Sequence, residues 1–150
     1  MIRRKIYISR AVFAVTPSVI EEILVAARRN NQRDGLSGLL ISDQGLFFQI
    51  LEGPDDAIAR CYARILQDQR HCDVRLMSDD MHPARAFPDW KMGYAQPKDL
   101  PSAAREAMQS LVVLAEADAA ALITDNIHEA IDHFVDVFEN SGGEPAMLDV

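Results

Sequence analysis

A short apolar segment with one amide in its middle constrains the fold of this chain more than any other feature. Residues 45–54 read GLFFQILEGP, the pattern of a buried β-strand that ends at a Gly-Pro break. A side-chain amide among large apolar residues needs polar partners, because burying it without them costs roughly 1–3 kcal/mol. Gln49 therefore faces either solvent or a polar group inside the protein, which is a second side chain or the edge of a ligand.

The order of the predicted elements around this segment favours an α+β fold. Strand patterns occupy residues 2–9, 38–42, 46–52, 74–77 and 90–94, and helical patterns begin near residues 17 and 54. The order β-α-β-β-α-β, with one strand added, is that of a ferredoxin-like sheet with two helices on one face. Residues 1–96 are therefore expected to form the main domain.

A helical extension, residues 97–150, is predicted to follow. Prolines mark a linker at residues 96–101, and helical patterns follow at 102–115 and 118–139. We expect these two helices to pack on the other face of the sheet or against a partner protein. The second helix carries an apolar stripe that must be buried. The stripe consists of Leu122, Ile123, Ile127, Ile131, Phe134, Val135 and Phe138.

Local signals predict where the main elements begin and end. Thr16-Pro17 suits the start of a helix, although Ser18 with Glu21 offers a competing capping box. The helix is expected to end near Asn30-Asn31, before Gly35, and Asn commonly caps a helix end. Residues 43–45 form a hairpin loop, and residues 78–88, with two prolines, are expected to be a loop.

Charge and cysteine usage exclude several classes of function. The net charge is −8, and residues 76–150 carry four Lys or Arg against fourteen Asp or Glu. Direct binding to nucleic acid or to anionic membranes is therefore not expected. Cys61 on an apolar helix stripe and Cys72 in a predicted turn read as reduced thiols of a cytoplasmic protein. Neither a secretory signal nor a membrane-spanning apolar run is evident.

Five short motifs, in order along the first two-thirds of the chain, resemble those of the BLUF family of flavin-binding blue-light sensors. They are Tyr-x-Ser at residue 7, Asn-Asn followed by Gly-x-x-Gly at 30–38, Phe-x-Gln-x-Leu-Glu-Gly at 47–53, the helix end at 62–71 and Phe-x-x-Trp-x-Met at 87–92. Each motif alone is weak, and their joint occurrence is specific. The resemblance covers residues 1 to about 96.

The resemblance implies a photochemical role for Tyr7 and Gln49. In this family the tyrosine donates an electron and a proton to the photoexcited flavin, and the glutamine relays and rearranges. Taken alone, Tyr7 could equally be a core tyrosine. The resemblance also implies that Asn31 holds the polar edge of the isoalloxazine ring and that Asn30 lies beside it, whereas the residues alone favour helix capping.

The resemblance extends to the second helix. Arg64 and Asp68 are four residues apart, which predicts an ordinary exposed ion pair worth about 0.2–0.5 kcal/mol. The resemblance places Arg64 near the ribityl-phosphate tail of the cofactor and Asp68 near a ribityl hydroxyl. It also makes Ile23 and Ile65 the aliphatic walls of a slot for the flat ring, a role that core packing does not exclude.

Four further positions match the family with less specific chemistry. Trp90 and Met92 are alternate residues of a predicted strand and are expected to point the same way, either as core residues or, by the resemblance, as the switchable segment. Ser9 and His71 also match family positions near the cofactor. The implied cofactor is FAD, with FMN or riboflavin as alternatives.

The sequence therefore predicts a cytoplasmic blue-light photoreceptor without enzymatic turnover. The chain stops about fifty residues after the Trp-x-Met motif, which leaves no room for a cyclase or phosphodiesterase domain. Signalling is expected through a homo-oligomer or an unknown downstream protein. No metal site is expected, because His128 and His133 are five apart without cysteine partners. The alternatives are a flavin-dependent reductase and a flavin-free interaction module.

Overall fold

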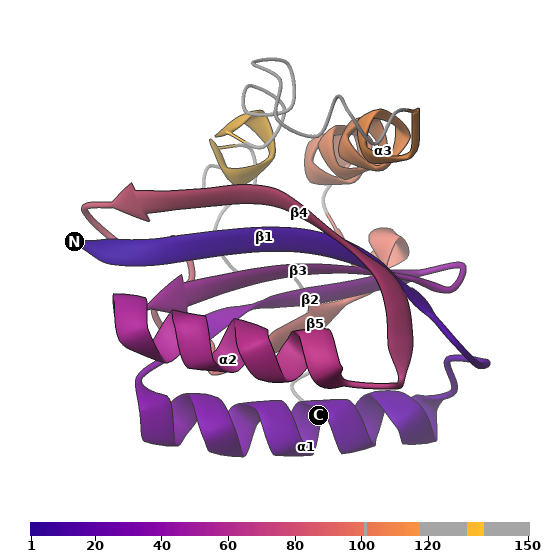
Figure 1. Ribbon diagram of the computed structural model, residues 1–150. Helices are drawn as coiled ribbons and strands as arrows, with labels where there is room; N and C mark the ends of the chain where they lie inside the picture. Colours follow the sequence, from indigo (N-terminus) through magenta and orange to yellow (C-terminus); the bar gives the residue numbers. More distant parts are fainter. Residues whose placement is uncertain (101, 118–131, 137–150) are drawn as a thin grey trace.

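The fold is a five-stranded sheet with helices on both faces (Figure 1). The computed structural model describes residues 1–100, 102–117 and 132–136. The sheet has the order β4-β1-β3-β2-β5, in which only the β2–β5 pair is parallel. The elements are β1 (Ile2–Ala11), α1 (Pro17–Asp34), β2 (Ser37–Asp43), β3 (Leu46–Gly53), α2 (Asp55–Gln67), β4 (His71–His82), β5 (Gly93–Ala95), a 3₁₀ turn η1 (Pro97–Asp99) and α3 (Ser102–Ala117).

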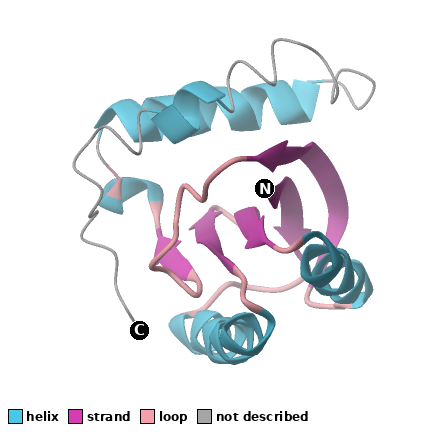
Figure 2. Ribbon diagram, turned by 90° about the vertical axis from the view of Figure 1, so that its left-hand side faces the viewer, coloured by secondary structure: helices cyan, strands magenta, loops and turns pink. Residues whose placement is uncertain are grey.

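Each face of the sheet has its own apolar core. Helices α1 and α2 cover one face, and α3 with residues 132–136 lies over the other (Figures 1 and 2). The alternation of side chains along β3 separates the two cores, because successive residues point to opposite faces. Phe47 and Leu51 pack toward α1 and α2, whereas Phe48 and Ile50 pack toward α3. The predicted ferredoxin-like α+β arrangement is confirmed.

Helix α1 begins and ends close to the predicted residues. Thr16 Oγ1 accepts a hydrogen bond from the N–H of Val19 at 3.3 Å, so Thr16 is the N-cap. The helix stops at Gly35, which adopts a left-handed conformation (φ 71°) that glycine enters without steric penalty. The helix therefore ends before Gly35, as predicted, and Asn30 and Asn31 lie inside its last turns and do not cap it.

A tight turn between β2 and β3 fixes the register of the central strands. Gln44 (φ 48°) and Gly45 (φ 81°) both have positive φ, as a two-residue hairpin turn of the primed type requires. The loop is one residue shorter than predicted, since Asp43 is already in β2. The pairing of β3 with β1 then places Gln49 directly opposite Tyr7.

Strand β4 extends well beyond the predicted residues 74–77. It pairs with β1 from His71 to His82, so the loop predicted at 78–88 begins only after His82. Asp79 is held by two hydrogen bonds from the Arg3 guanidinium, at 2.6 and 2.8 Å, which ties the added half of the strand to β1. Cys72 lies in this strand and is exposed, not in a turn.

The fifth strand is shorter than predicted, and this changes the segment before it. Only Gly93–Ala95 pair with β2, so Trp90 and Met92 precede the strand and do not point the same way. Trp90 packs with the α3-side core and stacks on Phe87 with ring centroids 5.6 Å apart. Met92 is buried in the core beneath α1 and α2. The expected alignment of the two residues was therefore wrong.

The second face of the sheet is covered in part by the predicted C-terminal helices. Met108 on α3 is buried in the α3-side core. Of the predicted helix at 118–139, the structure describes residues 132–136, which are helical, and Phe134 packs its ring 5.5 Å from that of Phe48. In the described part of the chain, no helix is long and apolar enough to cross a membrane. The predicted stripe residues Leu122, Ile123, Ile127, Ile131 and Phe138 lie outside the described residues.

Candidate functional site

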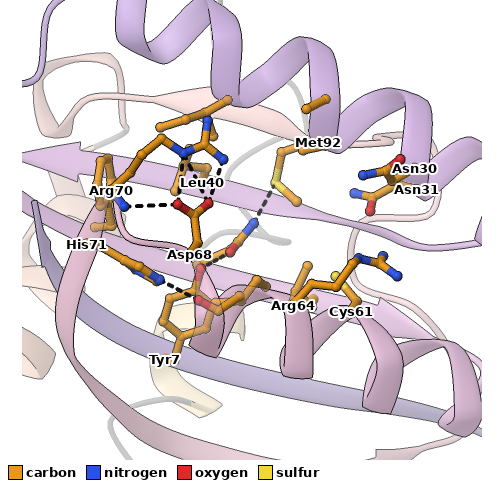
Figure 3. A pocket seen from close by; sticks show the side chains of 17 residues that line it. Tyr7, Asn30, Asn31, Leu40, Cys61, Arg64, Asp68, Arg70, His71 and Met92 are labelled. Carbon is orange, nitrogen blue, oxygen red and sulfur yellow. Dashed lines mark hydrogen bonds and ion pairs between the residues drawn. The ribbon is translucent and has the colours of Figure 1, made fainter.

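A cavity of about 280 Å³ lies between α1, α2 and the sheet face that they cover (Figure 3). This volume is close to the lower end of the range for small-molecule pockets. Most of the predicted site residues line it, and their side chains come from both helices, from three strands and from the segments that follow α2 and precede β5. Those predicted residues are Tyr7, Ile23, Asn30, Asn31, Gln49, Arg64, Ile65, Asp68, His71 and Met92.

Tyr7 and Gln49 form the floor of the cavity on neighbouring strands. The Tyr7 hydroxyl donates a hydrogen bond to Gln49 Oε1, and both side chains are buried, with Gln49 7% exposed. The other end of the amide, Nε2, points to Met92 Sδ at 3.5 Å. A thioether is a weak acceptor, so this end of the amide is loosely held. Gln49 is therefore a buried amide with a polar partner, which excludes the solvent-facing alternative.

Burial controls the protonation of Tyr7. Removal from water raises the pKa of the Tyr7 phenol well above its ordinary value, and the nearby Cys61, Tyr62 and Asp68 add to the effect. The phenol therefore keeps its proton at neutral pH and donates it to the Gln49 oxygen. The ring of Tyr62 lies 6.0 Å from that of Tyr7, and the His71 ring lies at 6.2 Å.

Two amides from the last turns of α1 face the other end of the cavity (Figure 3). Asn31 is buried, and its Nδ2 donates to the carbonyl oxygen of Lys91, in the segment before β5. Among the described residues, neither Asn31 Oδ1 nor the Asn30 amide has a hydrogen-bond partner from the protein. These positions supply both donors and acceptors to a ligand edge.

The predicted ion pair between Arg64 and Asp68 does not form. Asp68 lies past the end of α2 with an extended backbone, and its carboxylate binds the guanidinium of Arg70 at 2.5 Å. The hydrogen bond from Arg70 lowers the pKa of Asp68 despite an opposing effect of burial. Arg64 instead lies 3.4 Å from Asp34 of α1. The i, i+4 argument failed because α2 ends at Gln67, one residue before Asp68.

His71 links the cavity wall to strand β1. Its Nδ1 lies 2.7 Å from Ser9 Oγ and its Nε2 lies 2.7 Å from the carbonyl oxygen of Ile65. Because a carbonyl oxygen only accepts hydrogen bonds, Nε2 carries a proton. Nδ1, when it carries no proton, accepts a hydrogen bond from the Ser9 hydroxyl. Ser9 is buried but does not line the cavity, so it supports His71 from behind.

The two isoleucines predicted as walls of the slot line the cavity, but two arginines that contact the site were not identified from the sequence. Ile23 of α1 and Ile65 of α2 both line the cavity, whereas Trp90 does not. Arg70 lines it with Asp68, and Arg28 holds the segment before β5 by donating from Nε to the carbonyl oxygen of Met92 at 3.0 Å. Arg28 is three residues before Asn31, and this helical spacing was the available signal.

In the described part of the chain, no three or more His, Cys, Asp and Glu side chains gather where they could hold a metal ion. The site is instead a mostly apolar slot that also contains three amides, a phenol and two arginines. Such a set suits a flat, polar-edged organic ring with an anionic or hydroxylated tail.

The sequence matches a known domain family over most of its described length. Residues 2–93 match the family model "BLUF: Sensors of blue-light using FAD". Photoactivated adenylate cyclase subunit beta from Euglena gracilis is 37% identical over 87 residues, which is 57% of this chain and 10% of that protein. The blue light- and temperature-regulated antirepressor BluF of Escherichia coli is 38% identical over 68 residues, 45% of this chain and 17% of that protein. The chain thus spans a small part of these relatives.

Solved structures share the fold. The dark-state structure of BlrB, a BLUF protein, superposes with a TM-score of 0.69 and 30% identity, covering 87% of this chain and 94% of that chain. A bacterial light-regulated adenylyl cyclase gives a TM-score of 0.68 and 31% identity over 75% of this chain and 34% of that chain. The photo-activated state of BlsA, at 22% identity and a TM-score of 0.71, supports the fold alone.

Proposed function

This chain belongs to the BLUF family, and on that basis we propose that it is a blue-light photoreceptor that holds FAD between α1 and α2. The observation that carries the proposal is the hydrogen bond from Tyr7 to Gln49 on the floor of the cavity. A buried phenol and a loosely held amide, side by side at the wall of a ligand-sized pocket, are suited to a change of hydrogen bonding that a bound ring can trigger.

The residues present fit a flavin. Ile23 and Ile65 supply apolar contact for a flat ring, and the asparagine pair supplies the polar partners that its carbonyl and N–H edge requires. When bound, the flavin supplies absorption of blue light and an excited state that takes an electron from a neighbouring donor. Side chains of this protein then donate the electron and the proton and change their hydrogen bonds.

Tyr7 is the electron and proton donor in this proposal. The hydroxyl proton of Tyr7 already lies in a hydrogen bond to Gln49 Oε1. The proton can therefore leave along that bond when the phenol ring of Tyr7 loses its electron. Gln49 would then relay the proton toward the bound flavin that takes the electron, and the orientation of its amide would change. Among the described residues, Gln49 Nε2 has only the Met92 sulfur as its partner, so reorientation of the amide breaks a weak interaction.

The charged end of the cavity suits the cofactor tail. The Asp68–Arg70 pair lines the cavity away from the asparagine amides, whereas Arg64 lines it on the side of the asparagines (Figure 3). Guanidinium groups bind phosphate, and a carboxylate accepts a hydrogen bond from a ribityl hydroxyl. We propose FAD as the cofactor; FMN or riboflavin would leave part of this polar end without a ligand. Release of the cofactor and its identification by mass decides among the three.

The signal leaves the site through the segment before β5, which contains Lys91 and Met92. Both contact the site directly, through Asn31 and Gln49 respectively. We propose that the 1–96 unit senses light without enzymatic turnover and that residues 97–150 carry the change to a second copy or to an unknown protein partner. The net charge of −8 makes direct contact with nucleic acid or anionic membranes unfavourable. The free thiols Cys61 and Cys72 support a cytoplasmic location.

One experiment separates this function from its rivals. The absorption spectrum of the purified protein is recorded in the dark and after blue light, and a reversible red shift of the flavin band is expected. A colourless protein that takes up no added flavin would support a flavin-free interaction module. Bleaching by NADH in the dark, without a light-induced shift, would support a flavin-dependent reductase.

A further inference from the structure

The segment of residues 86–92 passes from one face of the sheet to the other. Phe87 and Trp90 pack in the α3-side core, whereas Met92 lies in the core beneath α1 and α2. Midway, the N–H of Gly38 donates to the carbonyl oxygen of Trp90 at 3.0 Å, which keeps the segment against the start of β2. The segment therefore connects the cavity side to the face covered by α3.

Strand β3 contacts both ends of this segment, once from each face. Gln49 and Glu52 are three residues apart and so point to opposite faces. Gln49 Nε2 lies 3.5 Å from Met92 Sδ at the far end of the segment. The Glu52 carboxylate accepts hydrogen bonds from the N–H groups of Ala86, at 2.9 Å, and of Phe87, at 2.8 Å, at its beginning.

Glu52 is firmly held in place. It is 0% exposed, and the buried guanidinium of Arg4 donates to its Oε2 at 3.1 Å and balances its charge. A buried carboxylate is tolerated only when it is paired and hydrogen-bonded, so the backbone amides of Ala86 and Phe87 are part of what stabilises it. Arg85 adds to the attachment by donating to the carbonyl oxygen of Gly35 at 2.6 Å and to Ser37 Oγ at 2.9 Å.

The two side chains of β3 hold the segment with unequal strength. Bonds from N–H groups to a buried carboxylate are charge-assisted, whereas a bond from an amide to a thioether is weak and here is long. A change at Gln49 would free the Met92 side chain, while the Met92 carbonyl oxygen keeps its bond from Arg28 and the Phe87 end stays on Glu52.

We propose that Glu52 is a positioning residue that anchors the start of the 86–92 segment, so that this end stays in place when Gln49 reorients and the Met92 side chain loses its contact. The light-driven part of this inference rests on the proposed function, but the anchoring itself does not. Trp90, stacked on Phe87, is the side chain that such an anchor would keep packed against the α3-side core.

The test uses Trp90 as a built-in probe, because it is the only tryptophan of the chain. Fluorescence emission and acrylamide quenching are measured in the dark on the full-length parent protein, with and without flavin, and on Glu52→Gln. The control is Asp79→Asn, which also removes an ion-paired carboxylate of the sheet but bonds Arg3 and not the segment. The urea-unfolding curve of each variant separates loss of stability from loss of positioning.

The double variant Arg4→Met/Glu52→Gln covers the case in which Glu52→Gln does not fold, because it leaves no unpaired charge in the core. In the single or the double variant, Trp90 is expected to show red-shifted emission and a larger quenching constant while the unfolding transition remains cooperative. Asp79→Asn should quench as the parent does. Parent-like quenching of Trp90 in the folded variants, or an equal rise in Asp79→Asn, would overturn the proposal.

The light response gives a second measurement. With flavin bound, the loosened segment is expected to return to the dark state at a rate different from that of the parent, with the red shift itself retained. An unchanged recovery rate beside increased quenching would overturn the coupling of the anchor to the switch. A parent protein without any red shift would instead refute the proposed function, and the quenching result would still decide the anchor.

Discussion

Tyr7 and Gln49 lie directly opposite one another in the antiparallel pairing of β1 and β3, and the phenol donates to the amide oxygen on the face that α1 and α2 cover. Directly opposed residues have Cβ atoms about 4.5–5.5 Å apart, so the ladder itself sets this contact. The hydrogen bond is thus a consequence of strand register. A one-residue slip of either strand would turn one of the two side chains to the other face.

The first prediction concerns this pair. Tyr7→Phe and Gln49→Leu should each retain flavin and lose the light-induced red shift, because each keeps most of the side-chain volume but breaks the hydrogen-bond path. Absorption spectra before and after blue light measure the result. Tyr62→Phe is a matched control, since Tyr62 lies 6.0 Å from Tyr7 without a hydrogen bond to Gln49, and it should keep the shift. A normal photocycle in Tyr7→Phe would remove Tyr7 from the role of donor.

A second prediction follows from the raised pKa of Tyr7. Free tyrosine ionises near pH 10, so above about that pH the unfolded chain loses a proton that folded Tyr7 keeps. The stabilisation from Tyr7 is therefore complete below pH about 10 and is lost as pH rises toward the higher folded pKa. Urea unfolding between about pH 8 and 11 should show a steeper loss of stability in the parent than in Tyr7→Phe. Equal slopes in the two proteins would show that Tyr7 ionises freely in the folded state.

Much of the site could be predicted from the sequence because its residues lie at fixed spacings within regular elements. Burial of Gln49 follows from its place in an apolar strand, and the slot walls follow from the helical stripes that contain Ile23 and Ile65. Asn30 and Asn31 line the cavity, but neither of them caps the helix, which was the role that the residues alone favoured. Gly35, four residues further on, is a stronger stop than either amide because it alone reaches the left-handed conformation without strain.

The segment before β5 could not be predicted, because long-range contacts fix it. Trp90 and Met92 read as alternating strand residues, yet backbone hydrogen bonds from Gly38 and side-chain bonds from Arg28 and Asn31 hold this segment outside the strand. These contacts join residues 52 to 64 positions apart, which local periodicity does not report. The partner of Asp68 is only two residues away, and it was missed for another reason, because it depends on where α2 ends.

The third prediction is that Asn31→Ala lowers both flavin occupancy and stability. Removal of the amide leaves the carbonyl oxygen of Lys91 without its donor, which should reduce the free energy of unfolding by about 1–3 kcal/mol. Flavin-to-protein absorbance ratios and urea unfolding measure the two effects. Asn30→Ala is the control, because the Asn30 side chain lines the cavity without bonding to Lys91, and it should affect occupancy alone. Full flavin occupancy and an unchanged dark spectrum in Asn31→Ala would show that Asn31 does not bind the edge of the flavin ring.

The last prediction concerns the face of the sheet opposite the cavity. A chain truncated after Gln96 should still bind flavin and show the red shift, because every residue that lines the cavity precedes that point. It should also aggregate, since removal of α3 and residues 132–136 uncovers a contiguous apolar face. That face includes Ile6, Ile8, Leu39, Ile41, Phe48 and Ile50.

A chain ending at Asp136 is the matched control, because it retains both described helical segments of this layer. Sedimentation in the dark and under blue light compares the assembly of the two chains, and absorption spectra compare their photocycles. We expect the shorter chain alone to lose light-dependent changes of assembly, since the path from Gln49 through residues 86–92 ends at the α3-side core. If the shorter chain stays soluble and monomeric, and light still changes its binding to a partner, residues 97–150 are not the output element.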